Sequence, residues 1–103
     1  MYIAVLDEVP SHMVPVLVAH SVLNAHIKFS TCNVLPSYTT WLRDSFKKVV
    51  LKVNRKEFDK ISEITAVYLG HENTTLEGTK SCIVVCPRDE YPNVIKFAKM
   101  WQP

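Results

Sequence analysis

The sequence predicts an α/β fold in which a mixed four-stranded sheet carries helices packed on its faces. Short apolar runs typical of buried strands alternate along the chain with stretches whose apolar residues recur at helical spacing. The order of these segments is β-α-α-β-α-β-β-α, as in layered α/β domains. A chain of 103 residues, 48% hydrophobic and 21% charged, suits one ordinary globular core, so residues 1–103 are expected to form a single domain.

Four runs of apolar and β-branched residues predict the strands. Residues 2–6 form a continuous apolar run that acids end, as expected of a buried central strand. The second strand is expected over 47–53, where charged residues flank the apolar ones. The third is expected over 65–69 and the fourth over 80–86, where Pro87 ends it.

The longest helix is expected to begin near Met13 and to run to about Phe29. Its apolar residues recur at helical spacing, and Val16, Leu23 and Ile27 widen the apolar stripe. We therefore expect this helix to be mostly buried.

Three shorter helices follow from local signals. Ser37 is expected to cap a short helix that ends near Asp44. Asn54 is expected to cap a helix over 55–64, with Glu57 completing a capping box. Pro92 is expected to open a last helix. The side chains available to pack from that helix are Val94, Ile95, Phe97, Ala98 and Trp101.

The cysteines and the apolar runs bear on compartment and cofactors. Cys32, Cys82 and Cys86 are odd in number and without dense spacing, so they argue against a secreted disulfide framework and make a poor zinc set. Buried thiols and no metal or other cofactor are expected. Met1 leads directly into a strand-like run, and the longest apolar stretch, 13–23, is too short to span a bilayer. We expect a cytoplasmic protein with no membrane partner.

Four strings spread over nearly the whole chain resemble segments of one enzyme family. They are Val-Ala-His-Ser-Val at 18–22, Trp-Leu at 41–42 leading into 47–53, Thr-Thr-Leu-Glu-Gly-Thr at 74–79 and Ile-Val-Val-Cys-Pro at 83–87. In this order they resemble the type II peptidyl-tRNA hydrolases. The resemblance implies the fold of that family and hydrolysis of the ester between peptide and tRNA. The small size resembles a viral or phage-type member.

The resemblance also implies site positions, several of which have changed. The family's lysine falls on Met13 and its glutamine on Leu17, so two polar groups have become apolar. The family's aspartate falls on Gly70 or His71, depending on a one-residue gap. The histidine is retained as His20, and the threonines are retained as Thr74 and Thr79.

Polar residues gather in two loops that should open at one end of the sheet, beside the start of the first long helix. Ligands of open α/β sheets bind in such a crevice. The predicted catalytic set is His71, Thr79, Thr74, His20 and His12. In this set, His12 replaces the family's lysine, whose position is taken by Met13. His71 acts as a base with Glu72 as its partner. The predicted substrate-binding residues are Asp7, Glu72, Asn73, Lys48 and Lys52, with Glu8 in the same loop as Asp7.

Each of these residues also has a structural interpretation. His20 lies on an apolar helix and can be a hydrogen-bonded core histidine, whereas His26 is expected to face solvent. His12, His71 and Glu72 can be polar loop residues. Thr74 and Thr79 can satisfy the backbone of a tight turn.

Basic residues crowd the middle of the chain, although the formal net charge is only +2. They are Arg43, Lys47, Lys48, Lys52, Arg55, Lys56 and Lys60, joined by Lys96 and Lys99 on the last helix. Strand alternation sends Lys48 and Lys52 to one face and Lys47 to the other. The group is either a solvated surface or one that contacts phosphates. Tyr38 and Trp41 either stack on a base or cover the core.

Two functions remain open, of which the first is the predicted function and the second its alternative. The first is a divergent peptidyl-tRNA hydrolase with a shifted set of polar groups. The second is a non-catalytic binding module of the same fold that grips a nucleotide, an RNA or a protein. The replacements at Met13 and Leu17 favour the binding module, whereas the threonine loop and His20 favour the hydrolase. A homodimer is compatible with both.

Overall fold

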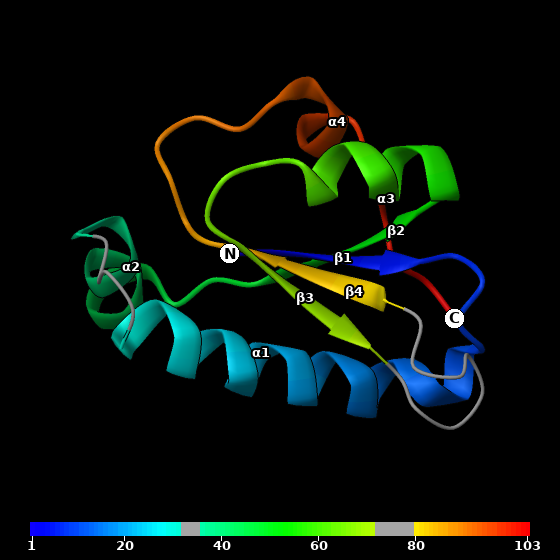
Figure 1. Ribbon diagram of the computed structural model, residues 1–103, viewed down its shortest axis with the longest axis horizontal. Helices are drawn as coiled ribbons and strands as arrows, with labels where there is room; N and C mark the ends of the chain where they lie inside the picture. The colour runs from blue at the N-terminus through cyan, green and yellow to red at the C-terminus, as the bar shows by residue number, and fades with distance from the viewer. Residues whose placement is uncertain (32–35, 72–79) are drawn as a thin grey trace.

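A computed structural model describes residues 1–31, 36–71 and 80–103 of the chain. These residues form an α/β fold around one mixed sheet of five strands, in the order β3-β4-β1-β2-β5 (Figure 1). The α/β class and the mixed sheet agree with the prediction, whereas the predicted count of four strands is wrong. The additional strand is β5 (Lys99–Met100), which pairs antiparallel with β2 after the last helix.

Strand directions decide which loops meet. The central strand β1 (Tyr2–Leu6) runs parallel to β2 (Val49–Val53) and antiparallel to β4 (Lys80–Val85). The edge strand β3 (Val67–His71) is antiparallel to β4, so β1, β2 and β3 all point the same way. Their C-terminal ends therefore lie along one edge of the sheet. The third strand begins two residues later than predicted because Ala66, with φ 58°, is in the left-handed region.

The helices lie on both faces of the sheet. On one face α1 (Val14–Thr31), preceded by the 3-10 helix η1 (Ser11–Met13), packs on β3, β4 and β1. On the opposite face lie α3 (Arg55–Ser62) and α4 (Asn93–Lys96), which pack on each other (Figure 1). The central strands are thus covered from both sides. This explains why β1 and residues 82–85 of β4 are apolar without alternation.

The start of α3 agrees with its predicted cap. The side-chain oxygen of Asn54 accepts a hydrogen bond from the Glu57 N–H at 2.8 Å, and Glu57 Oε1 accepts one from the Asn54 N–H at 2.9 Å. Two otherwise unpaired backbone donors are satisfied by this reciprocal pair. Phe58 and Ile61 are buried on the inner side of the helix. The capping box is confirmed.

The expectation that α1 is mostly buried is wrong. Val16, Leu23 and Ile27 are 61%, 62% and 54% exposed. The inner side of the helix packs on the sheet through residues such as Leu17 and Ala25, and no described element lies outside it. Among the described residues, no helix combines the length and apolar character needed to cross a bilayer.

The short helix after α1 has two parts. The α-helix α2 (Pro36–Thr40) continues as a π-helix, η2 (Trp41–Ser45), which ends at Phe46 in the left-handed region with φ 58°. Tyr38 and Trp41 are buried. Of the two interpretations offered for them, stacking on a base or covering the core, the structure therefore supports the second. The indole N–H of Trp41 donates to the Lys47 carbonyl oxygen at 2.7 Å.

The last helix is shorter than its apolar residues indicate. It ends at Lys96, and only Ile95 of its candidate packing residues is fully buried. Phe97 is 80% exposed, so the expectation that it packs inward is wrong. The chain turns at this point to place β5 beside β2, which carries Phe97 away from the core.

Candidate functional site

The strand registers align one row of residues across the α1 face of the sheet. From β3 to β5 the row consists of Gly70, Cys82, Val5, Lys52 and Lys99. The first three belong to the strands on which α1 packs, and the last two belong to β2 and β5. Among the described residues, the α1 face is therefore covered over three strands and uncovered over the other two.

A second row repeats this arrangement two residues away. It contains Tyr68, Val84, Ile3 and Val50 in order. Trp101 extends it, because its N–H donates to the Val50 carbonyl oxygen at 2.9 Å and thereby continues the β2–β5 register. The uncovered ends of the two rows, with Lys48 beyond them, form one surface. We call Lys48, Val50, Lys52, Lys99 and Trp101 the open strip.

An apolar groove of about 500 Å³ lies between α1 and the open strip. Ile3 and Val50 form its floor, and side chains of α1 and of the η2 segment form its walls. The wall residues are Pro15, Val18, Ala19, Val22, Leu23, His26, Tyr38, Trp41, Leu42 and Phe46, with Lys48 at the rim. Of the described residues, hardly any polar group faces this space, and none of those lining it is a carboxylate.

The η2 segment shapes one end of the groove through aromatic contacts. The left-handed backbone at Phe46 turns its ring back onto Trp41, with ring centroids 5.4 Å apart. Lys48 Nζ lies 3.3 Å from the centroid of the Phe46 ring, a cation–π contact. On the α1 side, His26 Nδ1 and Tyr38 Oη are hydrogen-bonded at 2.7 Å. Aromatic, cation–π and hydrogen-bond contacts between side chains therefore position this end of the groove, without backbone pairing to the sheet.

The charge of the open strip is not compensated within the described chain. Lys52 and Lys99 stand directly opposite each other on β2 and β5, where like charges destabilise a strand pair. Within residues 1–31, 36–71 and 80–103, neither ammonium forms an ion pair. The ion pairs in these ranges are Arg43–Asp44 at 3.1 Å and Arg55–Glu8 at 3.3 Å. An anionic partner would remove the repulsion.

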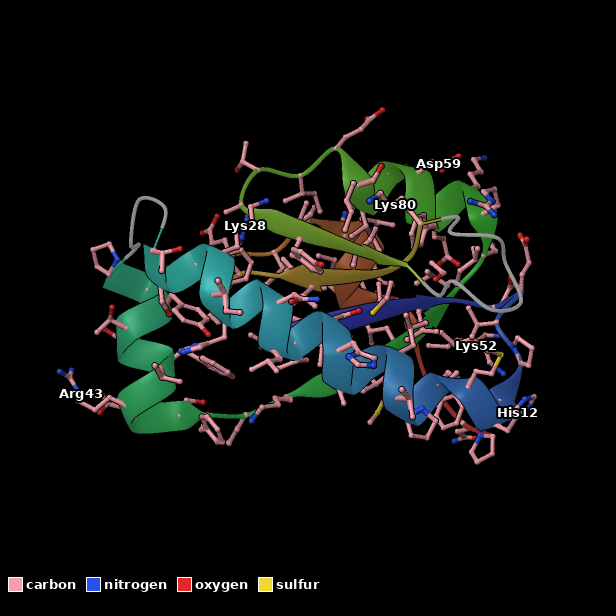
Figure 2. The ribbon with its side chains drawn as sticks, turned by 60° about the horizontal axis from the view of Figure 1, so that its bottom comes forward. His12, Lys28, Arg43, Lys52, Asp59 and Lys80 are labelled. Atoms are coloured by element: carbon pink, nitrogen blue, oxygen red, sulfur yellow. The ribbon has the colours of Figure 1, made fainter. Side chains whose placement is uncertain are left out.

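The predicted catalytic crevice is at the C-terminal ends of β1 and β3. These parallel strands end at one edge, so the loops that follow them leave the sheet on the same side. Figure 2 shows His12 and Lys52 at that same end of the molecule. Asp7 and His12 are exposed, and the described structure gives His12 no hydrogen bond. Glu8 is held by Arg55.

Several predicted site residues lie outside what the structure describes. They are the side chain of His71 and the whole of Glu72, Asn73, Thr74 and Thr79. The backbone of His71 ends β3 opposite Lys80, with a register irregularity between Gly70 and His71. The dyad of His71 with Glu72 and the threonine pair stay predictions.

The two histidines of α1 exchange their expected environments. His20 is exposed and has no hydrogen bond within the described ranges, so a hydrogen-bonded core position is wrong for it. His26 was expected to face solvent but is half-buried, bonded to Tyr38 and close to Ser30 Oγ at 3.3 Å. Both histidines lie within the apolar pattern of one helix, and only the docking of α2 distinguishes them.

The positions at which the resemblance implies changed residues have defined surroundings in the structure. Leu17 is 3% exposed and belongs to the core, and Met13 is half-buried beside it. A Cβ atom on Gly70 would lie 3.1 Å from Ser21 Cβ and would overlap Ser21 Oγ. Residue 70 therefore has no room for a carboxylate side chain.

The described thiols are buried, as predicted. Cys82 is fully buried, and burial raises the pKa of its thiol from 9.0 to about 11, a shift that the neighbouring Ser21 hydroxyl partly offsets. Burial also raises the pKa of Cys86. Cys32 is outside the described residues. No group of three metal-ligating side chains occurs in the described ranges.

A second cavity, of about 610 Å³, lies at the N-terminal ends of β1 and β2, opposite the edge at which the predicted crevice lies. It is lined by Tyr2, Trp41, Asp44, Lys47, Arg88, Asp89 and Tyr91, among others. Here charges of both signs face the same space, unlike in the groove. Lys47 lines this cavity and Lys48 lines the groove, so the two lysines face different spaces, and their placement on opposite faces of the sheet stays a prediction.

Sequence reasoning missed two of the five residues of the open strip. Lys99 and Trp101 were placed with the last helix, whereas they belong to β5 and its extension. The signal available was the alternation Lys-Met-Trp at 99–101, which is too short to define a strand. No protein-family model and no curated protein matches the chain.

Proposed function

We propose that this chain is a non-catalytic binding module that grips an anionic, partly apolar partner with the groove and the open strip. The observation that carries the proposal is the uncovered half of the α1 face. There, three lysines without carboxylate partners in the described chain stand beside an apolar groove.

The groove has the properties of a binding site. Its volume of about 500 Å³ falls in the range typical of ligand pockets. Exposed apolar side chains continue it at Leu23 and Phe46, which are 62% and 55% exposed. Contiguous apolar surface of this kind marks interaction sites in soluble proteins. Lys48, Lys52 and Lys99 would give the bound partner its orientation and its charge preference.

The described candidates for catalysis offer less support. Proton transfer requires a base within hydrogen-bond reach of its partner or of a bound water. His12 and His20 are exposed, and no described group positions either of them. The lysine and glutamine positions of the family carry Met13 and Leu17, and Leu17 faces the core. Binding without hydrolysis is therefore the better-supported function.

An anionic aromatic probe tests the proposal. Anilinonaphthalene sulfonate should bind the folded protein, and NMR amide shifts should concentrate at the groove and the open strip. Charge reversal by Lys52→Glu with Lys99→Glu should weaken binding by about fivefold, as expected for two partly exposed charges. The matched control, Lys56→Glu with Lys60→Glu, changes the net charge equally on the exposed side of α3 and should leave binding within about twofold.

The proposal fails if the probe does not shift amides of the open strip. It also fails if both double variants weaken binding equally, because net charge alone would then explain the effect. Circular dichroism of each variant distinguishes lost binding from lost folding.

Hydrolysis of peptidyl-tRNA is the second candidate, favoured by the common edge of the loops after β1 and β3. If it is correct, the purified protein releases peptide from a short peptidyl-tRNA faster than buffer does, and His71→Ala slows this release. A rate equal to the buffer blank rejects it and leaves the binding module.

A further inference from the structure

We propose that the groove and the open strip bind an amphipathic helix of another protein, apolar on one side and acidic along one flank. This inference rests on the proposed function and names its partner.

The part of the α1 face over β2 and β5 is about as wide as one packed helix. Neighbouring strands lie about 4.8 Å apart and packed helices about 8–10 Å apart, so one helix covers roughly two strands. On this face α1 packs on β3, β4 and β1, while β2 and β5 carry no described helix. A helix lying alongside α1 would complete the layer and bury Val50 and Trp101.

The groove follows α1 for several turns. Its α1 wall extends from Pro15 to His26, which at 1.5 Å per residue is about 16 Å, or three turns. A helix of matching length presents apolar side chains at i, i+3, i+4 and i+7 to such a groove. Val18, Val22 and Leu23 on one wall and Leu42 at its end would contact these side chains.

Charge fixes the orientation of the partner about its own axis. Lys48, Lys52 and Lys99 all lie on the β2–β5 side, whereas the α1 side of the groove is apolar apart from His26. Acidic residues along the flank that faces β5 would meet the three lysines. The same residues on the α1 side would be placed against aliphatic side chains, which provide no compensation.

Neither a second copy nor a single-stranded RNA matches this surface as well. Of the longer helices, α1 contains no acidic residue, and α3 has its apolar residues Phe58 and Ile61 buried. Neither therefore offers an exposed surface that is both apolar and acidic. For RNA, successive bases need several free aromatic faces, whereas the Phe46 ring already contacts Trp41 and Lys48, and the open strip itself contributes the single aromatic residue Trp101.

Matched peptides test the partner. A peptide of about 18 residues, long enough for several helical turns, carries leucine at i, i+3, i+4 and i+7 and glutamate along one flank. Its control has lysine in place of every glutamate. By fluorescence anisotropy the acidic peptide should bind with micromolar affinity and the basic peptide at least about tenfold more weakly. NMR amide shifts should mark the groove walls and both lysines of β2–β5.

Two variants of α1 locate the site. Leu23 and Ile27 are similarly exposed, at 62% and 54%, but only Leu23 lines the groove. Leu23→Asp should weaken the acidic peptide at least about tenfold, and Ile27→Asp should change it by less than about twofold. Equal effects of the two variants, or equal binding of the two peptides, would overturn the inference.

The remaining outcomes name other occupants. If anilinonaphthalene sulfonate binds the open strip but the acidic peptide does not, the binding module stands and the helical partner is wrong. Shifts of the same amides by a short single-stranded RNA would then assign the surface to RNA. Sedimentation that shows self-association abolished by Leu23→Asp would assign it to a second copy of the chain.

Discussion

Replacing Gly70 with valine should lower the free energy of unfolding by about 3 kcal/mol, at the upper end of the usual cost of overpacking a core. Gly70 is buried on β3 where α1 crosses it, and a Cβ atom there would overlap the Ser21 hydroxyl and lie 3.1 Å from Ser21 Cβ. Valine favours strands, so the same change would stabilise the protein if space existed. Thermal unfolding should show a midpoint lowered by more than about 10 °C.

A double-mutant cycle of Ser21→Ala and Gly70→Ala tests whether the overlap with the Ser21 hydroxyl causes this destabilisation. Alanine is used here because it adds the Cβ atom alone. The Ser21 hydroxyl is buried without a hydrogen bond to any described nitrogen or oxygen, and its neighbour, the Cys82 thiol, is a weak hydrogen-bonding group, so Ser21→Ala alone should be neutral or stabilising. In that background, the cost of Gly70→Ala should fall by at least about 1 kcal/mol, because the overlapping oxygen is gone. Additive effects would show that α1 and β3 do not meet as closely as described.

Alkaline pH should destabilise the protein through the Cys82 thiol. Burial raises the pKa of this thiol from 9.0 to about 11, so the folded state holds the proton more tightly than the unfolded chain. This contribution is complete below about pH 9 and is lost as the pH rises through about 11. At about 1.4 kcal/mol per pH unit, the full loss is roughly 3 kcal/mol.

Urea unfolding of the wild type and of Cys82→Ser at neutral pH and at about pH 11 measures this contribution. The variant has no thiol to titrate at this position, so its stability should decline less over the same range. Cys86 is intact in both proteins, and its own titration therefore cancels in the comparison. Equal declines would mean that Cys82 ionises as easily in the folded state as in the unfolded chain.

Most elements of the fold follow from local sequence signals. The apolar runs of β1 and β4 lie within one residue of their predicted bounds, and the Asn54 capping box lies where predicted. Each signal involves residues close together in the chain. β5 gives no such signal, because two residues cannot show a period, and its pairing depends on β2, far away in sequence.

The candidate site was predictable only in part. Strand order along the chain was enough to expect that the loops after β1 and β3 share an edge, and Lys48 and Lys52 were placed on one face. The groove was not predictable, because it is the space beside α1 and depends on which strands α1 covers. The position of Trp101 beside Val50 was not predictable either, because it follows from the register of β5 against β2.

The sequence by itself determined where the strands β1 and β4 and the long helix α1 lie, because apolar runs and helical spacing of apolar residues are local signals. It could not determine what lies on the outer side of an element. Val16, Leu23 and Ile27 have the same apolar character as the buried Leu17, yet they face outward. Tertiary structure decided that difference, because burial requires a second surface to pack against, and the described chain provides that surface on only one side of α1.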